Sequence, residues 1–202
     1  MIYILLPIFI LFSFLSPLYA VNNLSKEEIT SAYIYTISNK VDWPNESIND
    51  AFHIHIVAKN KSLCNTVKKT LKTAKIKNKN INVTYSSSSK IPDNVNVIYI
   101  DKSKSDFYTS IFDGVDSQAI LLISDGQKNK RQVMINLYEN EKKQIHFEIN
   151  KANIINQNLS VDPNIILLGG TEIDVAKLYR ASQETLRNQE KRLNSIEKLN
   201  SR

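Results

Sequence analysis

The sequence predicts an α/β fold with a mainly parallel sheet, flanking helices, an antiparallel hairpin at about residues 132–149 and an extended C-terminal helix. In the middle of the chain, short apolar runs alternate with amphipathic helical segments, which is typical of parallel strands joined by right-handed crossovers. A period of two at residues 132–149 indicates the hairpin. A charged segment with heptad-like spacing indicates the long helix.

Residues 1–20 form an apolar segment that contains no charged residue. We expect this segment to be a signal peptide that exports the chain to the periplasm. No Lys or Arg precedes the apolar run, and an uncleaved membrane anchor is therefore the alternative. Pro7 and Pro17 would shorten the uninterrupted helical part of such an anchor.

The composition indicates one globular domain with an appendage. Of the 202 residues, 42% are hydrophobic and 23% are charged, which argues against bulk disorder. The net charge of +6 includes a lysine-rich region at residues 59–90, but no aromatic residue lies between Lys59 and Lys79 to stack on bases. We therefore expect a solvated surface and no nucleic-acid partner. Cys64 is the only cysteine, and we expect a small buried side chain without an internal disulfide.

The first helix is expected at residues 24–41, where Ser25 and Glu28 have the spacing of a capping box. Trp43 and Pro44 follow, and Pro44 ends the helix because it disfavours the α conformation at the residue before it. The stripe that we expect to face the core comprises Ile29, Ala32, Tyr33, Ile37 and Val41.

Residues 52–58 alternate as a strand, so that His53 and His55 share one face. Two histidines at this spacing can bind a metal, but a site needs a third and usually a fourth ligand. His146 and Glu148 would supply them only if their strand were adjacent, which the sequence does not indicate. We therefore expect two partly exposed histidines and no metal site.

The next elements follow from the same periodicities. An amphipathic helix with Leu63, Val67 and Leu71 inward is expected first, and Asn150 is expected to cap a helix after the hairpin. These elements are a helix at 63–76, strands at 80–85 and 95–100, a helix at 105–112, a strand at 119–123, and a helix at 151–157. The inward set of the hairpin comprises Val133, Ile135, Leu137, Ile145, Phe147 and Ile149.

Five residues are candidates for ligand or partner binding, namely Trp43, Pro44, Asp125, Glu148 and Asn150. Asp125 follows the strand at 119–123, at the edge where open α/β sheets bind ligands, so a pocket near Trp43 and Asp125 is one hypothesis. Trp43 is the sole tryptophan, and it either plugs the core or stacks on a ligand or partner. Surface exposure of Glu148 and helix capping by Asn150 explain these two residues more simply.

Motifs for catalysis or nucleotide binding do not occur in the sequence. There is no Gly-rich fingerprint, phosphate loop or recognisable nucleophile arrangement, and we expect neither an enzyme nor a cofactor. Gly169 and Gly170 are explained by a turn before a helix, with Thr171 and Asp174 at its start.

The C-terminal segment, residues 171–202, has a weak heptad seam. The apolar seam residues Tyr179, Leu186, Leu193 and Ile196 are separated by polar ones, and charges of both signs surround them. This pattern predicts a helix, with a coiled coil in a homodimer as one state and a helix free in solution as the other. In the first state, the helix couples the domain to its partner.

Several short motifs, in this order, resemble the YfiR-like family of exported domains. They are Val41-Asp42-Trp43-Pro44 after a tyrosine-bearing helix, the VIYI strand, LLIS followed by Asp125-Gly126, and INL followed by FEIN. The resemblance covers residues 27–168 and implies a compact periplasmic α/β domain that regulates signalling. It implies contact with a membrane-bound diguanylate cyclase, or a role as the input domain of a receptor kinase. Some members are controlled by disulfides, but Val95 stands where they often carry a cysteine, so this control is not expected here.

Two functions are therefore expected as alternatives. In the first, the chain is a periplasmic regulator in cyclic-di-GMP signalling that binds a membrane signalling protein, with residues 24–168 as the domain and the C-terminal helix as the coupling element. In the second, it is a periplasmic small-molecule binding protein without a coupling role. The tail distinguishes the two, because a pure binding protein has no use for a heptad-like helix.

Overall fold

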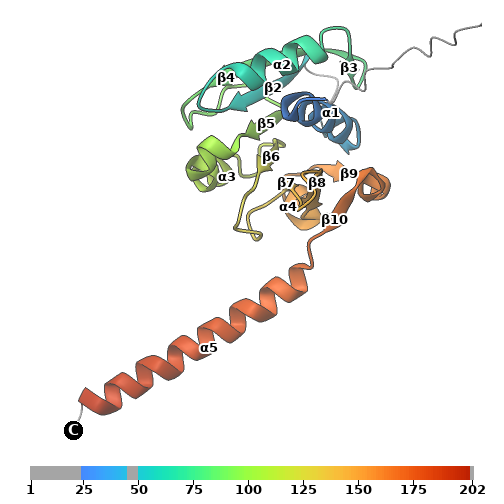
Figure 1. Cartoon of the computed structure of the whole chain (residues 1–202). Helices are drawn as coiled ribbons and strands as arrows, with labels where there is room; N and C mark the ends of the chain where they lie inside the picture. Colours follow the sequence, from blue (N-terminus) through green and yellow to red (C-terminus); the bar gives the residue numbers. More distant parts are fainter. Residues whose placement is uncertain (1–23, 45–49, 201–202) are drawn as a thin grey trace, which may run out of the picture.

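The computed structural model describes residues 24–44 and 50–200 (Figure 1). The predicted signal peptide at residues 1–20 lies outside the described residues. The helices are α1 Lys26–Asn39, α2 Ser62–Thr70, η1 Lys102–Phe107, α3 Tyr108–Gly114, α4 Lys151–Asn156, η2 Pro163–Leu168 and α5 Val175–Asn200. The strands are β1 Val41–Asp42, β2 Ala51–Val57, β3 Lys75–Ile76, β4 Lys79–Ser86, β5 Val97–Ile100, β6 Leu121–Asp125, β7 Ile135–Glu139, β8 Ile145–Ile149, β9 Ser160–Val161 and β10 Gly170–Glu172.

Eight strands form one sheet in the order β10-β8-β7-β6-β5-β2-β4-β3. The five neighbouring strands β4, β2, β5, β6 and β7 are parallel. Strands β7 and β8 form the predicted antiparallel hairpin, with Leu137 opposite Phe147 and Ile135 opposite Ile149. The α/β fold class, the mainly parallel sheet and the hairpin are therefore confirmed. Strands β1 and β9 form a separate antiparallel pair.

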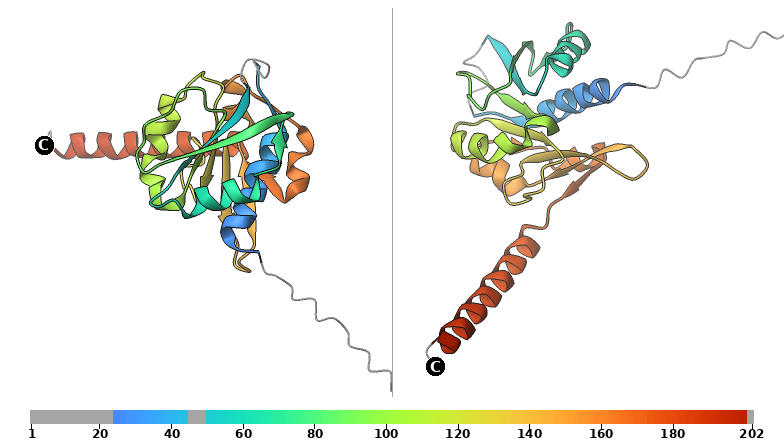
Figure 2. Two further views of the ribbon diagram at one scale, coloured as in Figure 1. Left: turned by 90° about the horizontal axis from the view of Figure 1, so that it is seen from above. Right: turned by 60° about the vertical axis from the view of Figure 1, so that its left-hand side comes forward.

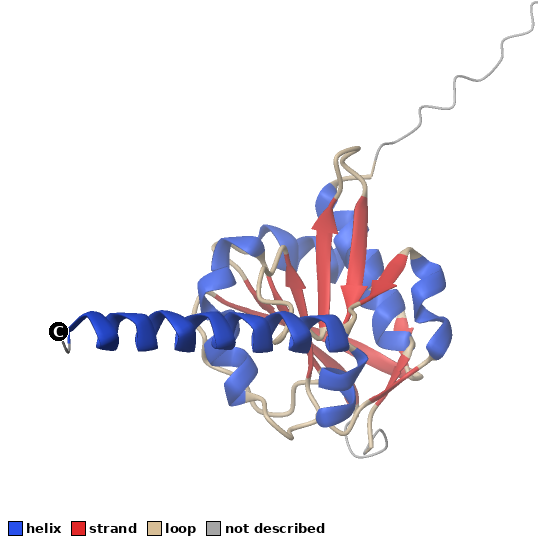
Figure 3. Ribbon diagram, turned by 90° about the horizontal axis from the view of Figure 1, so that it is seen from below, coloured by secondary structure: helices blue, strands red, loops and turns tan. Residues whose placement is uncertain are grey.

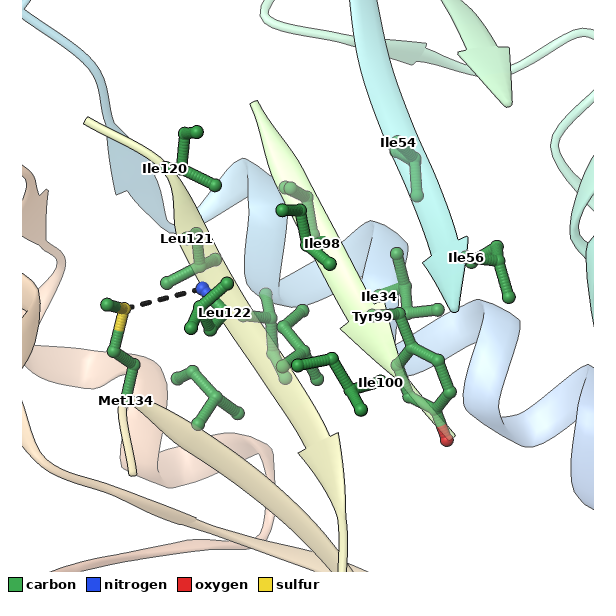
Figure 4. Packing of buried hydrophobic residues seen from close by; sticks show 14 of the residues in the cluster. Ile34, Ile54, Ile56, Ile98, Tyr99, Ile100, Ile120, Leu121, Leu122 and Met134 are labelled. Carbon is green, nitrogen blue, oxygen red and sulfur yellow. Dashed lines mark hydrogen bonds between the residues drawn. The ribbon is translucent and has the colours of Figure 1, made fainter. Parts of the chain in front are cut away.

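The helices cover both faces of the sheet (Figure 2). The connection from β2 to β4 and the connection from β5 to β6 run in opposite directions along the sheet, so right-handed crossovers place α2 and α3 on opposite faces. α1 packs on the α2 side, where Tyr33 makes an edge-on ring contact with Phe147, with the ring centroids 5.9 Å apart. The hydrophobic core lies between these layers, with Ile34, Tyr99 and Leu121 fully buried (Figure 4).

The capping box at the start of α1 is confirmed, because the Ser25 hydroxyl accepts from the Glu28 amide and the Glu28 carboxylate accepts from the Ser25 amide. The predicted buried stripe was wrong in part: Ile29 and Tyr33 are half-buried, and Ala32 is exposed. The buried side instead comprises Thr30, Ser31, Ile34, Ile37 and Ser38.

Serines can be buried on α1 because their hydroxyls are satisfied within the helix. Ser31 donates to the carbonyl of Glu27 at 2.7 Å, and Ser38 donates to the carbonyl of Ile34 at 2.6 Å. A polar residue that bonds its own helix costs little to bury. Hydrophobic spacing alone therefore identified Ile37 and Val41, which are fully buried, but missed the serines beside them.

The predicted helix at 63–76 ends early, because α2 stops at Thr70 and residues 75–76 form β3. Lys77 and Asn78 both have positive φ, 50° and 62°, which is the backbone of a tight two-residue hairpin turn between β3 and β4. The inward residues Leu63, Val67 and Leu71 are buried as predicted, and so is Cys64.

The glycine pair after η2 forms more than the predicted turn. Gly169 has a positive φ of 92°, as expected at the end of a helix, but Gly170 begins strand β10, which pairs parallel to β8. A Cβ at Gly170 would lie 2.3 Å from the Phe147 ring, so only glycine allows the two strands to approach. The predicted helical segment 171–202 accordingly becomes helical at Val175.

α5 leaves the edge of the sheet and projects away from the α/β domain (Figure 3). Two residues connect it to β10: the Ile173 amide donates to the Ile149 carbonyl at 2.8 Å, and the Asp174 side chain accepts from the Lys177 amide at 2.8 Å. In the part of the chain that the structure describes, no helix has both the length and the apolar character that crossing a bilayer requires.

Candidate functional site

A cleft lies outside the carboxyl ends of β2, β5 and β6, and we call it the carboxyl-edge cleft. Its volume is about 290 Å³. From β2 the chain first adds β4 on one side and later β5 on the other, so the strand order reverses here, where open α/β sheets commonly bind ligands. The residues of the cleft that matter for its chemistry are Lys26, Thr30, Lys59, Tyr99, Asp101 and Asp125.

An ion pair between Lys26 and Asp125 closes one side of the carboxyl-edge cleft, with Nζ and Oδ2 2.8 Å apart. The Asp125 side chain is only 8% exposed, whereas that of Lys26 is 48% exposed. Burial by itself lowers the pKa of Lys26, but the hydrogen bond and charge of Asp125, with the charges of Glu139 and Asp101, outweigh burial and raise this pKa above its ordinary value. The acidic groups therefore hold Lys26 in its charged form.

Tyr99 also contributes to the carboxyl-edge cleft and is almost fully buried. Burial raises the pKa of its hydroxyl well above the ordinary value, and the charges of Asp125 and Asp101 raise it further. The hydroxyl therefore stays neutral and can act as a hydrogen-bonding group in the cleft. Asp101 was not predicted as a site residue, although it follows the VIYI strand as Asp125 follows the LLIS strand, and that parallel would have identified it.

Trp43 and Pro44 lie at the opposite edge of the sheet from Asp125. They line a separate cavity of about 540 Å³ together with Val95 and Ile120, which stand at the amino ends of β5 and β6. The length of β6 thus separates Asp125 from the cavity of Trp43, and the hypothesis of one pocket near both residues was wrong. Trp43 is 8% exposed and meets the Phe52 ring edge-on at 5.1 Å between centroids, so it packs into the core.

Glu148 belongs to a polar network on the face of the hairpin opposite Phe147. Its carboxylate forms an ion pair with Lys130 and accepts from the Asn136 side chain at 3.3 Å. Asn136 is fully buried and also accepts from the Ser124 hydroxyl at 3.0 Å and the Gln127 amide at 2.7 Å. The explanation of Glu148 by surface exposure was therefore wrong, because its side chain is 19% exposed and holds the loop after β6.

Asn150 caps α4 as predicted, with its side chain accepting from the Asn153 amide at 3.3 Å. It is buried, and its amide nitrogen also lies 3.5 Å from the Lys130 carbonyl. Its hydrogen bonds are thus made within the domain, which leaves capping as the role that the geometry supports.

His53 and His55 both lie on β2, whereas His146 lies on β8, and β5, β6 and β7 separate the two strands. His55 was expected to be partly exposed, but it is buried between Thr84 and Ser86, whose hydroxyls lie 2.7 and 3.0 Å from its ring nitrogens. Burial lowers the pKa of His55, so the neutral ring is favoured. Among the described residues, no group of three or more His, Cys, Asp or Glu side chains could hold a metal ion.

Within the described residues, neighbouring apolar side chains are exposed on α1 and on α5. On α1, three of the side chains that were expected to face the core, those of Ile29, Ala32 and Tyr33, line a shallow groove of about 160 Å³ with Leu168, and the neighbouring Leu167 is 79% exposed. On α5, the predicted seam residues Tyr179, Leu186, Leu193 and Ile196 are between 50% and 66% exposed. An exposed row of this kind on a projecting helix is typical of an interaction surface.

Comparison with protein families matches residues 27–169 to a family described as YfiR/HmsC-like. The matched region is more than half of the chain and ends between η2 and β10. Comparison with curated proteins finds no match.

Proposed function

The chain belongs to the YfiR/HmsC-like family, and from this premise we propose that it is a regulatory or sensory domain that controls a membrane signalling protein by direct contact. Members of the family are periplasmic regulators of diguanylate cyclase signalling rather than enzymes. The proposed partner is accordingly a membrane-bound diguanylate cyclase or a receptor of the kinase type.

We assign three parts to the chain in this proposal. Residues 1–20 act as the signal peptide for export, residues 24–168 form the regulatory α/β domain, and residues 171–202 contain the coupling helix. β10 at Gly170–Glu172 ties the coupling segment to the sheet through β8, so a displacement of the hairpin would be passed directly to the start of α5.

The projecting α5 with its exposed apolar row is the observation that carries the coupling role. A helix of 26 residues whose apolar side chains remain in water is more stable when it pairs with another helix. We propose that the chain forms a homodimer through α5 and that the dimer presents the domain to the membrane protein.

Deletion of residues 184–202 tests this proposal. We expect the full chain to sediment as a dimer and the truncated chain to sediment as a monomer with unchanged Trp43 fluorescence, because Trp43 lies in the core of the domain. A matched control replaces exposed polar residues of α5 outside the seam, for example Asn188→Ala, and should remain dimeric. An unchanged oligomeric state after the deletion would reject the coupling role.

The contact with a cyclase is tested in the native bacterium by the cellular level of cyclic di-GMP. Removal of the gene should change this level, and the chain truncated at residue 183 should fail to restore it. The N188A chain should restore it fully. A level that does not respond to removal of the gene would argue against the regulatory role.

The carboxyl-edge cleft supports a second candidate function, a periplasmic small-molecule binding protein. The supporting observation is that a cleft of about 290 Å³ stands where the strand order reverses and contains a buried carboxylate with its lysine partner. Replacement of Asp125 by Asn should then change the affinity for a small molecule without changing the oligomeric state. Ligand binding by a chain without residues 184–202 would favour this candidate over the coupling role.

A further inference from the structure

The seam of α5 differs between its two kinds of position. Tyr179, Leu186 and Leu193 recur every seventh residue, and each is at least 50% exposed. They occupy the a positions of a heptad, so the d positions fall at Ser182, Gln189 and Ile196. The seam is therefore apolar at each of these a positions and polar at two of the d positions.

We infer that α5 pairs with α5 of a second copy as a parallel, in-register coiled coil. This inference rests on the proposed function, in which a second copy covers the helix, and it adds the direction and the register of the pair. The polar seam positions and the charges beside the seam support it independently.

The polar seam residues match only in the parallel pair. In that arrangement each layer contains the same residue twice, so Gln189 faces Gln189 of the second copy, and the two amides can hydrogen bond to each other. In an antiparallel pair of the same overlap, a positions face d positions, and Leu186 would meet Gln189 while Leu193 would meet Ser182. That pairing buries polar groups against leucine without a partner.

The charges beside the seam are complementary in the parallel pair. Arg192 precedes an a position and Glu197 follows a d position, and both side chains are exposed. In parallel coiled coils, these flanking positions meet five residues apart on opposite helices, so Arg192 meets Glu197 of the second copy, and symmetry repeats the contact. In the antiparallel pair, Arg192 would meet Thr185, and Glu190 would meet Gln183, so neither contact is an ion pair.

The parallel direction places both α/β domains at the same end of the helix pair. Two residues, Ile173 and Asp174, connect β10 to α5, and they are held by hydrogen bonds to Ile149 and Lys177. The two sheet edges would therefore enter the coiled coil together, and a symmetric membrane protein could receive both.

Disulfide trapping tests whether the two α5 helices run parallel. The chain is expressed with its own amino-terminal segment. Ser182→Cys, in a Cys64→Ser background, should form a dimer linked through position 182 on mild oxidation, because equivalent d positions lie close enough for a disulfide only in a parallel pair. Ser195→Cys is the matched control, since position 195 lies outside the seam and should remain unlinked. A mixture of Ser182→Cys and Leu193→Cys chains should give no mixed dimer.

Charge reversal gives a second readout that needs no new cysteine. Arg192→Glu should raise the dimer dissociation constant roughly tenfold, because two ion pairs become repulsive contacts. The double variant Arg192→Glu with Glu197→Arg should restore it.

The outcomes separate the inference from the proposal on which it rests. A dimer in sedimentation that links positions 182 and 193, or that forms neither disulfide, overturns the parallel register and leaves the proposed dimer in place. A monomer at every protein concentration overturns both. Linkage through position 182 together with the charge-swap rescue supports both.

Discussion

Replacement of Gly170 by alanine tests how closely β10 packs on the hairpin. The new Cβ would lie 2.3 Å from two carbon atoms of the Phe147 ring. This ring is fully buried beneath Tyr33, so it cannot move without displacing α1. Overpacking of this kind costs about 1–3 kcal/mol, and the lower entropy of the unfolded alanine chain offsets about 0.4–1 kcal/mol. We expect a net loss of about 1–2 kcal/mol in the free energy of unfolding.

Urea unfolding followed by Trp43 fluorescence measures this loss, because Trp43 is the only tryptophan and is buried in the domain. With a urea dependence of about 2 kcal/mol per M, the midpoint should fall by about 0.5–1 M. Gly114→Ala is the matched control. Its Cβ would meet only the end of the Ile91 side chain, at 2.8 Å, which can rotate away, so the midpoint should fall less.

A double-mutant cycle identifies Phe147 as the cause. Phe147→Ala removes the ring and should itself cost about 3–5 kcal/mol. In that background, Gly170→Ala should cost nothing further, because the methyl group enters the space that the ring has left. An equal cost of Gly170→Ala in both backgrounds would refute the explanation by steric contact.

Three further predictions follow from buried polar groups. Burial lowers the pKa of His55 below 6.5, so the unfolded chain takes up a proton at a higher pH than the folded chain does. The free energy of unfolding should therefore decrease as the pH falls below about 6.5. Urea titrations at several pH values should show this decrease in the His53→Gln variant, and the decrease should be lost in the His55→Gln variant. Asn136→Ala should cost about 1–3 kcal/mol in the same assay, because it leaves buried partners unsatisfied. Asn140→Ala in the hairpin loop should cost less, because water can replace most of the hydrogen bonds of that partly buried side chain. Burial raises the pKa of the Cys64 thiol, so an aromatic disulfide reagent should react slowly with the native chain and rapidly in urea, and rapid reaction without urea would contradict the burial.

Much of the local structure was predicted correctly because its signals are local. The capping box of Ser25 and Glu28, the cap at Asn150 and the alternation of the hairpin each depend on residues a few positions apart. The buried face of α1 was predicted only in part, because Ser31 and Ser38 satisfy their hydroxyls within the helix and are buried like apolar residues. The strand β3 was missed because Lys77 and Asn78 adopt positive φ without a glycine.

The candidate site was predicted only in pieces. Asp125 was found because it follows a buried strand, but Lys26, which pairs with it, lies 99 residues away in the sequence, and no local pattern joins the two. Glu148 and Asn136 face each other across the hairpin, and their network becomes visible only when the register of β7 and β8 is known.

The residue pattern alone was sufficient to specify the family, the α/β class, most of the helices and strands of the domain and the apolar row of α5, because periodicity and capping act over one or two turns of chain. Strand order acts over the whole chain and could be read only in three dimensions. It sends Trp43 and Asp125 to opposite edges of the sheet, brings Lys26 to Asp125, and inserts β10 beside β8, where Gly170 has no Cβ and so leaves room for the Phe147 ring.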